Sequence, residues 1–244
     1  MDNRYERVHQ APTQALQGKI LTYQIGDVNG DRIPDWVYVT GNYPYPDSPF
    51  VDTMKLIVQD GKTSALYSLP LTERAGYEPT LFLGDFTGDG VKDIQLTINS
   101  GGSGAFTYEY VYSFLDNQAR KLFDFEQFNQ AYRYKVTYLD YYQVKVKSLN
   151  ATNHYTIDIR YKGKEYLSEI YDEKGRLKEP IEGDVSPVGG LYPVDFNYDG
   201  VFELLAFQRI YGRYRADGLG DLITVLKWNG NRFTPTLQWV GIFG

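Results

Sequence analysis

The sequence predicts an all-β fold: a β-propeller of four-stranded blades, most simply four blades, three with a calcium loop and one degenerate. Three observations carry this prediction. Acidic nine-residue loops recur along the chain, and each is followed by a strand-length run of β-branched, aromatic and apolar residues. Equivalent loop positions lie 58 residues apart from Asp27 to Asp85, and 110 apart, twice 55, from Asp85 to Asp195. No segment of useful length repeats apolar residues at uninterrupted helical spacing.

The three acidic loops place oxygen-bearing side chains at their positions 1, 3, 5 and 9. That spacing suits a hard cation, because a tight turn can point every second side chain inward while the carbonyl at position 7 supplies a further ligand. Calcium is the cation expected, in up to three sites. The predicted ligands are Asp27, Asn29, Asp31, Ile33 and Asp35 in the first loop, Asp85, Thr87, Asp89, Val91 and Asp93 in the second, and Asp195, Asn197, Asp199, Val201 and Glu203 in the third.

The loops depart from the EF-hand at position 12, where an EF-hand places a bidentate Glu on an exiting helix. Here that position is Tyr38, Leu96 or Ala206, and a strand follows the loop. With Gly-Asp opening the first two loops and Asp-Gly at positions 5 and 6 of the last two, the pattern resembles the FG-GAP or VCBS repeats of integrin α-subunits and bacterial surface proteins. The resemblance implies a calcium-stabilised β-propeller that binds its partner at a surface.

A surface turn is the alternative interpretation of any one loop, since Asp, Asn and Gly are also the ordinary turn formers. Three copies with the same phase, each followed by a strand, favour the cation site. Without a cation, the three carboxylates of each loop would repel one another by roughly several kcal/mol at an intermediate dielectric, and a bound dication removes that cost.

Taken in order, the chain begins with a polar arm over residues 1–18, which contains His9. The propeller domain is expected over residues 19–244, in repeats of approximately 19–77, 78–132, 133–187 and 188–244. The third repeat keeps its strands but retains only Asp140 where an acidic loop should be. Residues 126–132 could form a short turn of helix, and 172–190 are the longest irregular connection. The predicted strands are 20–25, 36–41, 53–59 and 64–69; 80–83, 94–99, 106–115 and 121–125; 134–139, 141–147, 155–161 and 165–171; and 191–194, 204–211, 222–227 and 234–240.

Composition bounds the partners and the compartment. The net charge of −6 disfavours nucleic acid and anionic membrane surfaces. The absence of cysteine excludes disulfides and thiolate chemistry. No run is long enough to span a membrane, and residues 1–7 are too polar for a signal peptide. We expect an extracellular or cell-surface protein whose signal peptide was removed, because loops without the Glu of a sensor suit millimolar calcium. A cytoplasmic location is the alternative.

A ligand is expected at the longer loops, which should lie on the face opposite the acidic loops. These longer loops are rich in Tyr, Arg and Gly, residues that make good contact surfaces on rigid β scaffolds. The alternative is that their tyrosines only fill the funnel of a small propeller. The candidate ligand-binding residues are Tyr43, Tyr45, Tyr77, Tyr211, Arg213 and Tyr214.

The function predicted from these features is a calcium-stabilised binding module of the bacterial cell surface or envelope that recognises a protein or a glycan. Two alternatives stay open: a polysaccharide hydrolase or lyase on the same scaffold, and a purely structural envelope or spore-surface protein. No catalytic residue is predicted, because cysteine is absent and His154 has no motif around it. A carboxylate pair acting on a glycoside would be the route to an enzyme.

Overall fold

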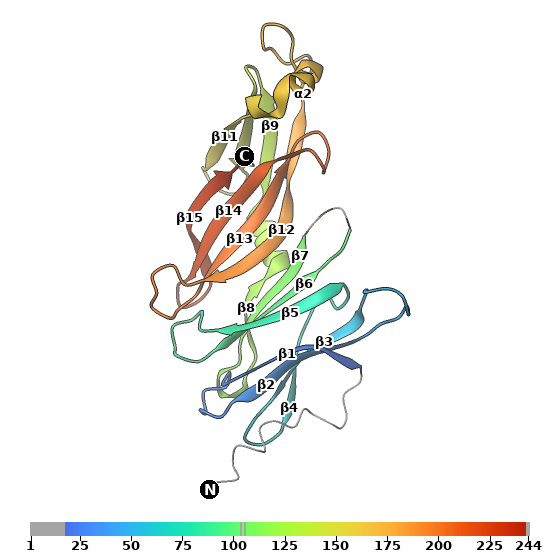
Figure 1. Cartoon of the computed structure of the whole chain (residues 1–244). Coiled ribbons are helices and arrows are strands. Elements are labelled where there is room, and N and C mark those ends of the chain that lie inside the picture. The colour runs from blue at the N-terminus through green and yellow to red at the C-terminus, as the bar shows by residue number, and fades with distance from the viewer. Residues whose placement is uncertain (1–17, 103, 105, 243–244) are drawn as a thin grey trace.

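The computed structural model describes residues 18–102, 104 and 106–242, which form three antiparallel β-sheets (Figure 1). The first two sheets have four strands each, in the order of the chain. The first sheet contains β1 (Lys19–Gly26), β2 (Asp35–Asn42), β3 (Asp52–Gln59) and β4 (Leu66–Leu69). The second contains β5 (Tyr77–Gly84), β6 (Asp93–Asn99), β7 (Thr107–Ser113) and β8 (Arg120–Asp124).

The third sheet has seven strands in the order β11-β10-β9-β12-β13-β14-β15. It curls so far that its two edge strands meet. Where they meet, the Tyr155 hydroxyl on β11 donates to Gln238 Oε1 on β15 at 3.0 Å. Its strands are β9 (Tyr134–Leu139), β10 (Gln143–Ser148), β11 (His154–Asp158), β12 (Glu182–Val194), β13 (Glu203–Tyr211), β14 (Gly218–Trp228) and β15 (Phe233–Gly241).

In the described part of the chain, the sheets are accompanied by two α-helices, α1 (Phe125–Ala131) and α2 (Gly163–Ile170), and by single turns of 3-10 helix at Leu115–Asn117 and Arg160–Lys162. The short helix α1 follows β8 because Asp124 caps it, accepting hydrogen bonds from the backbone N–H groups of Glu126 and Gln127. None of the described helices is long and apolar enough to cross a membrane.

The all-β prediction is confirmed, and in the first two repeats the predicted strands match the observed ones closely. The short helix predicted at 126–132 is also present, as α1. The predicted strand 165–171 is wrong, because that segment forms α2. The residues Tyr166, Leu167 and Ile170 recur at helical spacing there and pack against one apolar cluster. The predicted arm, with His9, lies outside the described residues except for Gly18.

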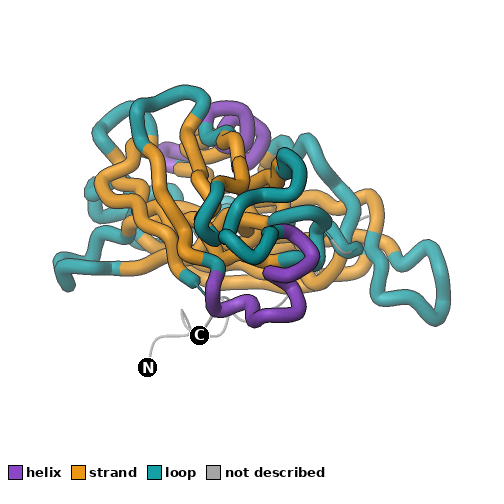
Figure 2. Tube along the Cα trace, turned by 90° about the horizontal axis from the view of Figure 1, so that it is seen from above, coloured by secondary structure: helices purple, strands orange, loops and turns teal. Residues whose placement is uncertain are grey.

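The four-bladed propeller is not what the described chain forms. Residues 182–190, predicted to be irregular, extend β12, whose Gly183 pairs with Val136 of β9. This pairing merges the third and fourth predicted repeats into one sheet. The three sheets then follow one another along the long axis of the molecule (Figure 1). Seen down that axis, the described strands lie across one another and do not radiate as blades (Figure 2).

Two apolar clusters hold the fold together. The larger lies between the first and second sheets and continues into the third, because it includes Val188 and Leu191 of β12 and Leu204 of β13. The smaller fills the curl of the seven-stranded sheet and is covered by α2. The larger cluster therefore joins the two halves of the chain into one packed body.

Candidate functional site

The three acidic loops repeat one hydrogen-bond pattern. At position 9, the carboxylate accepts from the backbone N–H of position 2. The carboxylate at position 1 accepts from the N–H of position 6, and the carboxylate at position 5 accepts from the N–H of position 7. The position 9 acceptors are Asp35, Asp93 and Glu203. The position 1 acceptors are Asp27, Asp85 and Asp195, and those at position 5 are Asp31, Asp89 and Asp199.

The loops are also stacked on one another along one edge of the molecule (Figure 1). Phe202, from the third loop, donates its backbone N–H to the carbonyl of Asp85 in the second loop at 2.7 Å. A Cβ on Gly30 of the first loop would lie 3.2 Å from Val91 of the second. The three loops are therefore neighbours in the fold, but they form a row and not the ring that the propeller prediction implied.

The oxygens of these loops serve the backbone of the loops themselves. Among the described residues, no group of three or more His, Cys, Asp or Glu side chains is arranged so that it could hold a metal ion. Asp140, the acid kept at this place in the predicted third repeat, accepts from the N–H of the distant Leu177 at 2.9 Å and not from its own turn.

Uncompensated charge differs between the loops. Asp93 is 2% exposed. Burial, together with the neighbouring Asp89 and Asp85, raises the pKa of Asp93 to about 7. In the third loop, Lys227 lies 3.0 Å from Glu203 and supplies a positive charge. The third loop therefore carries its own counter-ion, whereas the second loop holds its buried carboxylate beside two further acids.

Of the predicted ligand-binding residues, Tyr43 and Tyr45 lie in the β2–β3 connection and Arg213 and Tyr214 in the β13–β14 connection, whereas Tyr77 begins β5 and Tyr211 ends β13. Tyr43, Tyr45 and Tyr214 are exposed, at 47%, 61% and 57%, so they do not fill a funnel. The other three are engaged within the protein. Tyr77 packs edge-on against Phe50, the Tyr211 hydroxyl donates to Asp184, and Arg213 pairs with Glu169.

The structure brings these six residues together only in part. Arg213 lies over the rings of Tyr166 and Tyr214, whereas Tyr43 and Tyr45 belong to the β2–β3 connection of the first sheet. His154, at the start of β11, is exposed. Isolated exposed tyrosines offer a contact surface but no concave site.

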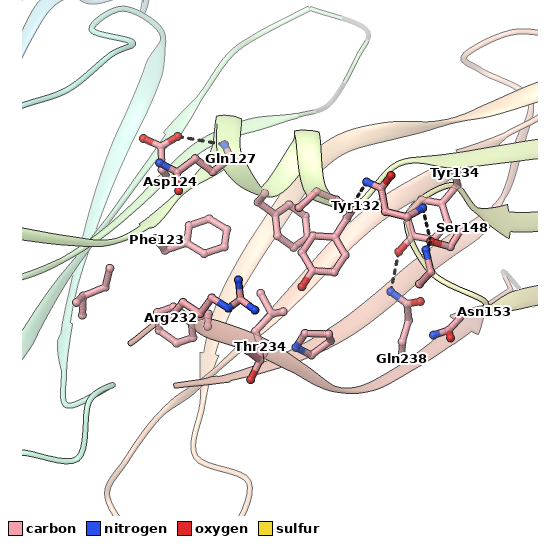
Figure 3. Close-up of a pocket in the computed structure, with 18 residues that line it drawn as sticks. Phe123, Asp124, Gln127, Tyr132, Tyr134, Ser148, Asn153, Arg232, Thr234 and Gln238 are labelled. Atoms are coloured by element: carbon pink, nitrogen blue, oxygen red, sulfur yellow. Dashed lines mark hydrogen bonds between the residues drawn. The ribbon is translucent and has the colours of Figure 1, made fainter. Parts of the chain in front are cut away.

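A cleft that the sequence did not indicate lies where the second sheet meets the third, and its volume is about 440 Å³ (Figure 3). β8 and α1 form one side, and β15 with the β10–β11 turn forms the other. Its lining comes from distant segments, so no local spacing could have linked them. The lining residues are Leu122, Phe123, Asp124, Gln127, Phe128, Ala131, Tyr132, Tyr134, Ser148, Asn150, Ala151, Asn153, Leu226, Arg232, Phe233, Thr234, Pro235 and Gln238.

The cleft combines aromatic walls with one cationic group. Tyr132 stacks on Phe128 with ring centroids 4.6 Å apart. The Arg232 guanidinium points toward the Tyr132 hydroxyl (Figure 3). Burial raises the pKa of Tyr132, and the charge of Arg232 opposes that rise. Among the described residues, no carboxylate forms an ion pair with Arg232.

The amide groups of the cleft are held in place by the protein. Gln238 Nε2 donates to the Tyr134 hydroxyl at 2.8 Å and to Thr224 at 2.7 Å. Asn150 Nδ2 donates to the carbonyl of Ala131 at 2.8 Å. The cleft is therefore pre-formed, with an aromatic surface, the fixed amides of Gln238 and Asn150, and a guanidinium that has no carboxylate partner in the described part of the chain.

Fold and cleft together define an all-β protein in which a ligand-sized cleft separates an N-terminal pair of sheets from a C-terminal curled sheet. Residues 132–241, which span that curled sheet, match the family described as the YybI C-terminal domain. The chain is 48% identical over 225 residues to protein YybI of Bacillus subtilis (strain 168), across 92% of this chain and 86% of that protein. The chain therefore belongs to the YybI family. No solved structure matches it.

The family match shows that the resemblance to FG-GAP or VCBS repeats is wrong. The matched segment spans what the repeat interpretation divides into two blades, and β9 pairs with β12 within it. The physical reason is that the acidic spacing also satisfies the backbone N–H groups of a tight turn between strands. The same residue pattern therefore arises without the repeat family.

Proposed function

We propose that this protein is a binding module of the bacterial cell surface or envelope that holds an acidic glycan. The glycan would lie in the cleft where the second sheet meets the third, which we call the junction cleft. The observation that carries the proposal is the Arg232 guanidinium, which has no ion-pair partner among residues 18–102, 104 and 106–242, beside Tyr132 in an aromatic-walled cleft of about 440 Å³. A guanidinium binds a carboxylate in a bidentate manner. The apolar face of a sugar ring packs on an aromatic side chain, and fixed amides can bond its hydroxyl groups.

The exposed tyrosines on the side of the molecule opposite the acidic loops support a binding role as a second contact surface. Tyr43, Tyr45 and Tyr214 lie on connections between well-packed strands, where rigid aromatic side chains lose little entropy on contact. We propose that they extend contact to a protein or glycan surface around the main site.

Calcium is part of the proposal at the first two acidic loops. Asp35 and Asp93 are buried, and burial followed by neighbouring carboxylates raises the pKa of each. A dication would lower this electrostatic cost. The residues that would hold it are those at positions 1, 3, 5, 7 and 9 of each loop, and its role would be to stabilise the fold.

The test compares binding of polygalacturonate with binding of its fully methyl-esterified form, which keeps the sugar rings but loses the charge. We expect the native protein to prefer the acidic polymer. Arg232→Ala should weaken that binding by at least about tenfold, since a charge-assisted hydrogen bond contributes roughly 1.5–3 kcal/mol. Arg176→Ala removes the same charge from an exposed turn and serves as the matched control.

Three outcomes would count against this proposal. Equal binding of both polymers would show that the charge of Arg232 does not contribute to binding. Release of shortened products from a labelled polysaccharide panel would favour the hydrolase or lyase alternative. Failure of the protein to bind any member of a glycan array, combined with self-assembly into sheets or fibres, would favour the purely structural alternative.

A further inference from the structure

A second, narrower slot lies on the other side of the second sheet from its apolar core. Residues of β5, β6 and β7 form its floor, and Gly189–Pro193 of β12 form its other wall, which leaves a half-open slot of about 300 Å³. Strand alternation explains the floor: Ile94, Leu96 and Ile98 face the core, so Gln95 and Thr97 face the slot. A polar sheet face is ordinarily left to solvent, but here β12 crosses over it.

Glu109 is the charged group of this slot. It lies on β7 and is 1% exposed. Thr97 Oγ1 donates to one carboxylate oxygen at 2.6 Å, and Thr107 Oγ1 donates to the other at 2.7 Å. Among the described residues, no lysine or arginine forms an ion pair with Glu109. A buried carboxylate without a positive partner is costly, and it is retained where it has a use.

Gln95 supplies an independent observation. It is 3% exposed, and its Nε2 donates to the backbone carbonyl of Leu191 at 2.7 Å. Its Oε1 is buried and accepts no hydrogen bond from the described residues. The two threonine hydroxyls direct their hydrogens to Glu109, so they present lone pairs to the slot. The side-chain donors of Gln95, Thr97 and Thr107 are thus engaged within the protein, with Gln95 also hydrogen-bonded to Glu109, so this part of the floor presents acceptors to a ligand.

We propose that this slot binds the ammonium or guanidinium end of a small organic cation, with Glu109 as the counter-ion and Gln95 Oε1 as a second acceptor. A group rich in donors and positively charged is the complement of such a floor. Phe82 and Tyr192 also line the slot. Their rings can contact the alkyl chain of the ligand, and an aromatic face attracts its cationic end. A cavity of about 300 Å³ is far larger than a bare metal ion needs.

The protonation state of Glu109 gives the binding a pH dependence. Burial raises the pKa of Glu109 to about 7 in the empty protein. The titratable groups that face the slot are Glu109 on β7 and Tyr192 on β12, and the lining residues from β5 and β6 include none. A cation binds the ionised carboxylate, so affinity should fall by about 30-fold from pH 8.5 to pH 5.5 as Glu109 takes up its proton.

The experiment titrates the whole protein with n-butylammonium and with methylguanidinium at pH 8.5, followed by the amide NMR signals of β6, β7 and β12. The neutral isostere 1-butanol and potassium chloride are the matched controls. We expect saturable shifts with at least one organic cation and none with 1-butanol. Glu109→Gln should weaken binding by at least tenfold, while Glu126→Gln, which removes an exposed carboxylate of α1, should leave it unchanged.

A second variant keeps the proposal open to refutation if Glu109→Gln misfolds. Thr97→Val removes one donor to the carboxylate and should shift the onset of binding to higher pH. Absence of saturable shifts with both cations would overturn the proposal. Binding of equal strength by the Glu109→Gln variant would also overturn it, and so would equal shifts with potassium chloride. Either result would show that the slot does not recognise an organic cation through Glu109.

Discussion

At the scale of single residues, the acidic loops depend on two left-handed backbone positions. Position 4 is left-handed in all three loops, at Gly30, Gly88 and Tyr198, and position 6 is left-handed at Arg32, Gly90 and Gly200. Glycine adopts this conformation without steric cost, whereas other residues do not. The third loop therefore carries local strain at Tyr198, which is 92% exposed and has little packing to lose.

This conformational difference gives the first prediction. Tyr198→Gly should raise the free energy of unfolding by about 0.5–1 kcal/mol, because relief of backbone strain exceeds the entropy that glycine adds to the unfolded chain. The matched change in the second loop, Gly88→Ala, should act in the opposite direction. Its new Cβ would meet only the methyl groups of Val201, at 3.7 Å or more, so backbone strain alone decides the result. Chemical denaturation measures both, and effects of equal sign would contradict this account.

The second prediction concerns the pH dependence that Glu109 gives to stability. Its pKa is about 7 in the folded protein against an ordinary value of 4.5. Between these values, the folded state binds more protons than the unfolded state, so unfolding free energy falls as pH rises from 4.5 to 7. Glu109→Gln abolishes this loss. It should be more stabilising at pH 8 than at pH 4.5, by about 3 kcal/mol at most. A difference between variant and native protein that does not change with pH would contradict the prediction.

At the scale of elements, each acidic loop is fixed by its position 9 carboxylate. Asp35 is fully buried and accepts from the N–H groups of Val28 and Gly61, at 3.0 and 2.9 Å. It thus joins the first loop to the β3–β4 turn. Asp35→Ala leaves both N–H groups without an acceptor but also removes a buried charge, so we expect a net loss of about 2 kcal/mol. Asp47→Ala, at an exposed loop position, should change stability by less than about 0.5 kcal/mol in the same thermal melts.

The calcium proposal leads to a further prediction at this scale. With a dissociation constant of about 10⁻⁴ M and millimolar calcium, each occupied loop would contribute about 1.4 kcal/mol. The first two loops together would then contribute about 3 kcal/mol, and Asp89→Ala should abolish about half of the difference between melts in calcium and in chelator. A melting temperature that does not change on chelation would show that the loops act as capped turns alone.

At the scale of the whole molecule, one aromatic group couples the two halves of the chain. Phe86 is fully buried. Its ring lies about 6 Å from those of Phe82, Phe202 and Phe233, at 6.1, 6.0 and 6.2 Å. The latter two belong to the C-terminal half. Packing of this kind makes the sheets unfold together, since the larger apolar cluster is completed only by residues from both halves.

We therefore predict a single unfolding transition for the native chain. Phe86→Ala should lower its free energy of unfolding by about 3–5 kcal/mol without splitting it. Ile157→Ala lies in the other apolar cluster and should move the same transition by roughly 2–5 kcal/mol. Differential scanning calorimetry distinguishes the outcomes. Two transitions in the native protein, each moved by only one of these variants, would show that the halves are independent.

The candidate sites differ in how far the sequence could predict them. The acidic loops were found because their residues are local and repeat. The sequence did not reveal that their carboxylate oxygens cap the N–H groups of the loops, since this capping depends on backbone geometry. The junction cleft was missed because Tyr132 and Arg232 are 100 residues apart and meet only after the sheets pack. Glu109 carried no local signal either, since an alternating strand predicts an exposed carboxylate where β12 in fact covers it.

The sequence by itself determined the β class, the strands and turns of the first two sheets and the three equivalent loops, because period-two alternation and turn residues act over a few neighbouring positions. Only the tertiary structure decided that β9 pairs with β12 and that the sheets stack in place of forming a ring. Strand pairing across more than forty residues is chosen by the burial of whole apolar faces, which no single segment specifies.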